Sequence, residues 1–87
     1  MKDEFVKRYN ENLVKAVKAD LDGRTRDADY LFGNAAGMLT SAYIMYDVFG
    51  TEILARMSRA SGLAYNIVCG VVEDEQESLR ILENDMA

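Results

Sequence analysis

Residues 3–21 repeat their apolar side chains at spacings of three and four, and this period restricts the segment to an amphipathic α-helix. Asp3 and Glu4 stand near the expected N-terminus and Lys18 near the C-terminus, so the charges at both ends suit the helix dipole. Gly23 follows the segment and predicts a left-handed C-terminal cap. The apolar stripe comprises Phe5, Val6, Tyr9, Leu13, Val14, Val17 and Leu21.

The rest of the chain also favours helices, because none of its 87 residues is proline. An interior proline costs a helix about 3 kcal/mol, so long helices require that absence. A second helix is predicted to start at Thr25 as its N-cap, to run to Phe49 and to stop at Gly50. A third is predicted to begin after Thr51, and the acidic run 73–77 opens a last amphipathic stretch.

Two features of the C-terminal half leave alternatives open. Ser61-Gly62 either bends or breaks the third helix, since glycine costs about 1 kcal/mol in a helix interior. The β-branched run 66–72 is also compatible with a short strand. The last stretch either continues the third helix or forms a fourth. The expected fold is therefore all-α, a single domain over residues 1–87 built as a small bundle of three to four helices.

The predicted second helix, 25–49, is apolar around nearly its whole circumference, which is typical of a central helix contacted on several sides. The charge-free run from Tyr30 to Tyr46 is 17 residues long, at the short edge of a membrane span. Its glycines and small polar residues favour a buried core helix instead. The other elements of one chain would cover two of its sides, so a homodimer is expected to cover the third.

Small residues recur every four positions on this helix at Gly33, Gly37 and Ser41 and therefore share one face. A similar stripe follows in the third helix, at Ser58, Gly62, Asn66 and Gly70. The favoured interpretation is that the two stripes face each other inside one chain, so that Gly37→Leu would be destabilising. The alternative is that the first stripe docks another chain. The predicted helix-packing or dimer surface comprises Gly33, Gly37, Ser41, Tyr43, Tyr46 and Phe49.

Catalytic and metal-binding residue types are scarce in this chain. The sequence contains no histidine and one cysteine, Cys69, so the usual acid/base group and zinc ligand sets are missing. Asp29 and Asp47 flank the apolar run, but they would lie roughly 27 Å apart along one helix and could not act as a pair. We therefore expect a protein that is not an enzyme and that has no cofactor and no metal site.

The net charge of −5 is concentrated in residues 73–87, which hold six acidic residues and one arginine. An acidic chain is a poor ligand for nucleic acid. The acidic run is a candidate partner-binding surface that could mimic nucleic acid, formed by Glu73, Asp74, Glu75 and Glu77. A single cysteine and a charged N-terminus without the apolar core of a signal peptide predict a cytoplasmic location.

The small size, the negative charge and the scarcity of catalytic residue types together suggest a class of function. Small acidic helical chains without catalytic groups are common among inhibitors encoded by phages and mobile elements, including proteins that block CRISPR nucleases. We expect a non-enzymatic protein that covers the surface of another protein, for example a nucleic-acid enzyme of a host. The alternative is a small transcriptional regulator, or a nucleotide-binding sponge at an oligomer interface. Direct DNA binding is not expected, since segment 63–69 lacks the basic residues of a recognition helix.

Overall fold

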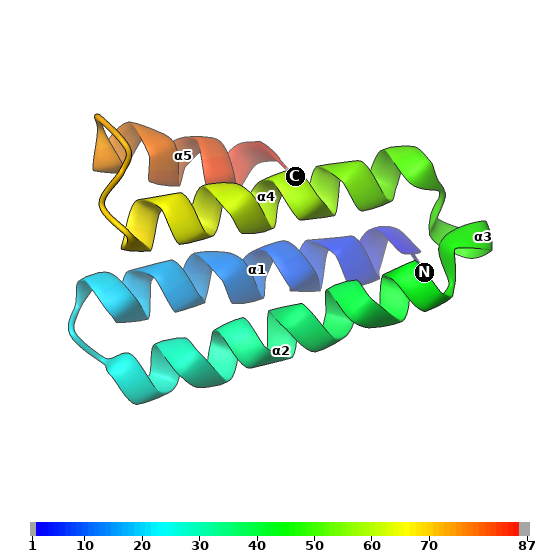
Figure 1. Cartoon of the computed structure of the whole chain (residues 1–87), viewed down its shortest axis with the longest axis horizontal. Coiled ribbons are helices and arrows are strands. Elements are labelled where there is room, and N and C mark those ends of the chain that lie inside the picture. Colours follow the sequence, from blue (N-terminus) through cyan, green and yellow to red (C-terminus); the bar gives the residue numbers. More distant parts are fainter. Residues whose placement is uncertain (1, 86–87) are drawn as a thin grey trace.

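Five helices make up the computed structural model, which describes residues 2–85. They are α1 (Lys2–Leu21), α2 (Thr25–Ile44), α3 (Tyr46–Phe49), α4 (Thr51–Val68) and α5 (Glu75–Asp85). α1, α2 and α4 run side by side along the long axis, and α5 lies beside α4 (Figure 1). The described residues contain no strand, so the all-α prediction is confirmed and the alternative of a strand over 66–72 is wrong.

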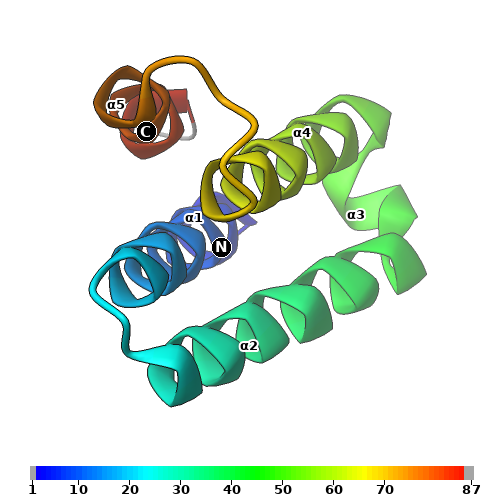
Figure 2. The ribbon, with the colours of Figure 1, turned by 60° about the vertical axis from the view of Figure 1, so that its left-hand side comes forward.

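The helix with the most buried residues is α1, which contacts α2, α4 and α5 (Figure 2). It buries seven residues. α2 buries only Ala28, Ala35 and Ala42, which stand two turns apart on one face and pack it against α1. The prediction of a bundle around a central helix 25–49 is therefore wrong. Most of the apolar side chains of that segment lie half-buried or exposed at the surface.

Two buried polar side chains connect α1 to its neighbours. The Tyr9 hydroxyl donates a hydrogen bond of 2.9 Å to the backbone oxygen of Met57, which joins α1 to α4. Asn10 Nδ2 donates one of 3.1 Å to the backbone oxygen of Leu82, which joins α1 to α5. Buried polar groups cost free energy unless they are paired, so these bonds fix how α4 and α5 sit on α1.

Glycine ends two of the helices. Gly23 has a φ of +79°, and the N–H of the next residue, Arg24, donates to the oxygen of Ala19 at 2.8 Å. This is the Schellman arrangement, and it confirms the predicted cap at Gly23. Gly70 (φ +74°) ends α4 in the same way. α4 is continuous through Ser61-Gly62, and α5 is a separate helix.

The N-caps differ from those predicted. Arg24 and Gly50, rather than Thr25 and Thr51, occupy the N-cap positions of α2 and α4, and neither makes a side-chain capping bond. Both threonines are instead the first helical residues. The glycine at position 50 has a φ of 85° and a ψ of 157°, a backbone conformation that favours glycine and that lets α4 turn back along α1.

The predicted helix over 25–49 is broken at Met45, which has a φ of −103° and a ψ of 39°. A single helical turn, α3, follows the break. It brings Phe49 into the core, where its ring centroid lies 5.1 Å from that of Phe5 on α1. The break therefore buries one aromatic side chain and leaves its neighbours in the sequence on the surface.

Candidate functional site

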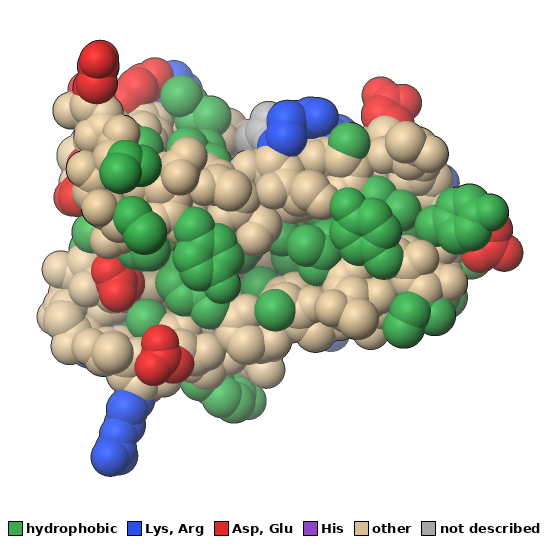
Figure 3. All heavy atoms as spheres, in the orientation of Figure 1, with side chains coloured by type: hydrophobic (Ala, Val, Ile, Leu, Met, Phe, Trp, Pro, Cys, Tyr) green, Lys and Arg blue, Asp and Glu red, His purple; other side chains and the backbone are tan. Residues whose placement is uncertain are grey.

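Five large apolar side chains remain exposed at the junction of α2 and α3, with exposed fractions from 47% to 77%. They are Tyr43, Ile44, Met45, Tyr46 and Val48, and we call them the α3 ridge. Figure 3 shows hydrophobic side chains gathered along the seam between α2 and α4 and over the α3 end of the molecule. Contiguous apolar surface of this kind marks sites of interaction with proteins, ligands or membranes.

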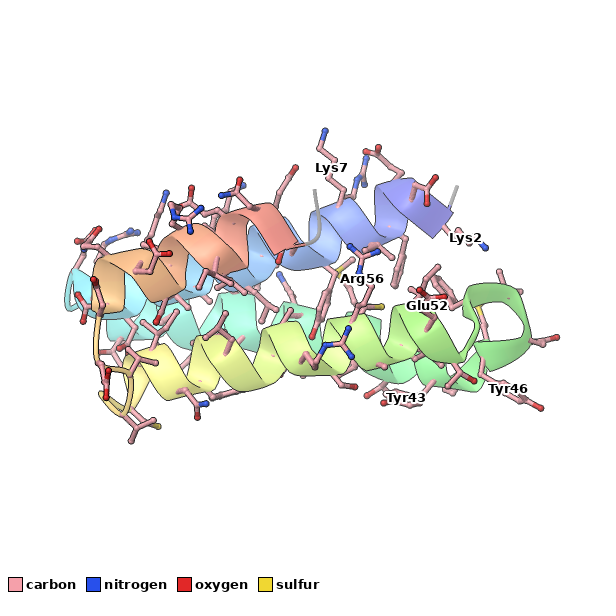
Figure 4. All side chains as sticks on the ribbon, turned by 90° about the horizontal axis from the view of Figure 1, so that it is seen from above. Lys2, Lys7, Tyr43, Tyr46, Glu52 and Arg56 are labelled. Atoms are coloured by element: carbon pink, nitrogen blue, oxygen red, sulfur yellow. The ribbon has the colours of Figure 1, made fainter. Side chains whose placement is uncertain are left out.

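A hollow lies on one flank of the ridge, between α3 and α4. It encloses about 360 Å³ and is lined by Tyr43, Tyr46, Thr51, Leu54 and Ala55. The two tyrosines point to the same side of the bundle (Figure 4). The Tyr43 hydroxyl lies 2.7 Å from the Ser58 hydroxyl, which holds the ring against α4. We call this space the α4-side hollow.

A second hollow lies on the other flank, between the ridge and the N-terminal turn of α1. It encloses about 190 Å³ and is lined by Lys2, Phe5, Ser41, Met45, Val48 and Phe49. Lys2 is the one charged side chain among its described lining residues. We call this space the α1-side hollow. The ridge thus separates two apolar hollows that share no lining residue.

The charges at this end of the molecule are mixed in sign. Asp47 on α3 and Lys2 on α1 are both exposed, and neither forms an ion pair within residues 2–85. The acidic segment 73–77 lies at the other end of the long axis, which extends 37 Å (Figure 1). The ridge is therefore remote from the greatest concentration of negative charge.

Within residues 2–85, no other helix packs against the two glycines of the small-residue stripe of α2. Gly33 and Gly37 are exposed, and a Cβ atom added at either position would meet nothing within 4 Å. The interpretation that the two stripes face each other inside one chain is therefore wrong. The face of α2 that packs inside the chain carries Ala28, Ala35 and Ala42, and it faces α1. Ser41 lines the α1-side hollow. The alternative, that this face docks another chain, stays a prediction.

This geometry reverses the expected effect of Gly37→Leu. Leucine at this exposed helical position meets no neighbour and has the higher helix propensity, so we expect the free energy of unfolding to rise by about 0.5–1 kcal/mol. Urea unfolding measured by circular dichroism tests this expectation. A loss of stability, or a change of molecular mass, would show instead that another chain packs on this face.

Of the residues predicted for helix packing or a dimer contact, Phe49 packs inside the chain, since only 7% of it is exposed and it belongs to the core. Tyr43 and Tyr46 are exposed, as a contact surface requires. The site also contains Ile44, Met45 and Val48, which were not predicted as site residues. Their signal in the sequence is the dense apolar segment 42–49, which only Asp47 interrupts and which is too apolar for one helix face to bury.

Part of the predicted acidic surface has a local structural role. Asp74 Oδ1 accepts a hydrogen bond of 3.0 Å from the backbone N–H of Glu77 and so caps α5. Glu77 Oε2 in turn accepts a bond of 2.9 Å from Arg80 Nε, and this bond lowers the pKa of the Glu77 carboxyl. Glu73 and Glu75 remain exposed. Two of the four acids thus help to start and stabilise α5.

Other kinds of site find little support in residues 2–85. No group of three or more His, Cys, Asp or Glu side chains within them is placed to hold a metal ion. None of the helices they form is long and apolar enough to cross a membrane. The chain matches no protein-family model, no curated protein and no solved structure, so its function has to be argued from its own residues.

Proposed function

We propose that this chain is a non-enzymatic protein-binding protein that acts by covering a functional surface of another protein. The observation that carries the proposal is the α3 ridge, in which five large apolar side chains are exposed although side chains of the same types are buried elsewhere in the chain. Interfaces are enriched in tyrosine and methionine and depleted in charge at their centres, and the ridge has that composition.

The most concrete version of the proposal is an inhibitor of a host defence system, of the kind that phages and mobile elements direct against CRISPR nucleases. Its support is the combination of small size, net negative charge and a sequence without histidine. In this version the ridge makes the apolar protein contact. The exposed carboxylates of Glu73 and Glu75 would face the basic surface of a nucleic-acid enzyme.

We expect Tyr46→Asp to abolish partner binding while leaving the fold intact, because Tyr46 is 65% exposed and a charge at the centre of an apolar contact has to be desolvated. Tyr30→Asp is the matched control, since Tyr30 is 70% exposed on α2 at the opposite end of the bundle. The measurement is inhibition of target-DNA cleavage by purified CRISPR nucleases, with capture from a host lysate as a second readout.

The control variant should inhibit cleavage and capture protein as the wild type does. If both tyrosine variants retain full activity, the ridge is not the contact surface. If the wild type itself neither inhibits any nuclease nor captures a protein, the proposed function is wrong.

A further inference from the structure

We infer that the occupant of the α3 ridge is a second copy of this chain, paired about a two-fold axis so that each ridge enters the α1-side hollow of the other. The inference rests on the proposed function, because it takes the ridge to be a protein contact surface. With a second copy on the ridge, the assembled dimer is the form that covers the surface of the other protein. Three observations carry it: the shape of the site, its area and its charges.

The shape of the site is self-complementary. A two-fold interface uses the same patch on both subunits, so the patch has to offer both a projection and a recess for it. The ridge provides the projection, since Ile44 is 77% exposed and Tyr46 is 65% exposed. The recess lies directly beside it, where Met45 and Val48 form one wall and Phe5 another. Each copy can therefore place its ridge in the α1-side hollow of the other, as two-fold symmetry requires.

The area of the site suits a dimer. With roughly 200 Å² for each large side chain, the exposed parts of the ridge amount to on the order of 500 Å² per chain. That is about a tenth of the chain's surface of 5507 Å², the share that a specific interface of a small protein typically occupies. Two copies would bury about 1,000 Å² in total, which is the least area expected of a biological interface and is typical of a weak, reversible dimer.

The charges at the site also fit a second copy. Asp47 lies on the projecting turn α3, and Lys2 lines the α1-side hollow that would receive it. Neither has an ion-pair partner among the described residues of its own chain. Exchange of ridge and hollow would bring Asp47 of each copy to Lys2 of the other, which forms two symmetric pairs.

The greatest concentration of negative charge lies away from this contact. The acidic segment 73–77 is at the end of the bundle opposite α3, well beyond a Debye length of about 8 Å from the ridge. The α3 end itself also carries the exposed carboxylates of Asp3, Glu4 and Glu52.

A charge exchange tests the pairing. Lys2→Glu and Asp47→Lys, made singly, place like charges opposite each other and should each weaken the dimer by at least about fivefold, and the double variant should restore it. Lys7→Glu is the matched control, because Lys7 is exposed on α1 and points away from the ridge (Figure 4). Dimer dissociation constants come from sedimentation velocity, with wild type near twice the 9.8 kDa chain mass.

Each outcome decides between the alternatives. Restoration by the double variant supports the pairing. If Tyr46→Asp dissociates the dimer but the charge variants leave its dissociation constant unchanged, the pairing of Lys2 with Asp47 is overturned. A wild type that stays monomeric at high concentration, while Tyr46→Asp loses its inhibition of nucleases, overturns the second copy but leaves the proposed function standing. If Tyr46→Asp changes neither mass nor inhibition, both fail.

Discussion

Met57→Ala is expected to lower the free energy of unfolding by about 2–5 kcal/mol, because it removes a large side chain from the centre of the core and leaves a cavity. Met57 is fully buried on α4 and belongs to the main cluster of core residues. A domain of this size has only about 4–13 kcal/mol of stability in total. Thermal unfolding followed by circular dichroism should therefore show a fall in Tm of more than about 10 °C.

Met45→Ala is the matched control for this prediction. It makes the same chemical change at a methionine that is 47% exposed, in the turn between α2 and α3. We expect its effect on the unfolding of the monomer to stay within about 0.5 kcal/mol. Equal losses in the two variants would show that burial does not distinguish the two positions and that the packing described for α4 is wrong.

The sequence predicts the helices well where the apolar period is regular. The stripe from Phe5 to Leu21 identifies α1 within one residue at its N-terminus, and Gly23 marks its end correctly. The contacts of Ala28, Ala35 and Ala42 with α1 are harder to recognise in the sequence. Alanine is a weaker hydrophobic signal than the tyrosines and isoleucine beside it. The large residues of segment 25–49 therefore predict a central helix, whereas small residues, Ala28, Ala35 and Ala42, make up the buried face of α2.

The candidate site could be predicted only in part, for a related reason. Tyr43 and Tyr46 were expected at a contact surface, and the structure exposes both. The two hollows depend on the break at Met45, on the packing of α3 beside α4 and on the contact of Phe49 with Phe5 of α1. No residue type in the sequence forces that break, since Met45 is neither glycine nor proline. Tertiary contacts of Phe49 in the core account for it.

The buried phenol of Tyr9 makes the stability of the fold depend on pH in the alkaline range. Burial raises the pKa of Tyr9 to about 12, and a hydrogen bond with the Ser61 side chain opposes that rise only in part. The phenol of an unfolded chain loses its proton near pH 10. Between about pH 10 and 12 the unfolded state releases this proton while the folded state keeps it. The stability that Tyr9 contributes is therefore complete below pH 10 and is lost as the pH rises toward 12, by up to about 2 kcal/mol.

Tyr9→Phe separates this titration from the other effects of alkaline pH. The variant loses the hydrogen bond to the backbone oxygen of Met57, so at pH 8 it should be about 1 kcal/mol less stable than wild type. It has no phenol at position 9 to titrate, so its stability should fall less steeply above pH 10. The two stabilities, measured by urea unfolding from pH 8 to 12, should converge and then cross. Parallel curves over that range would mean that the Tyr9 phenol is not buried against α4.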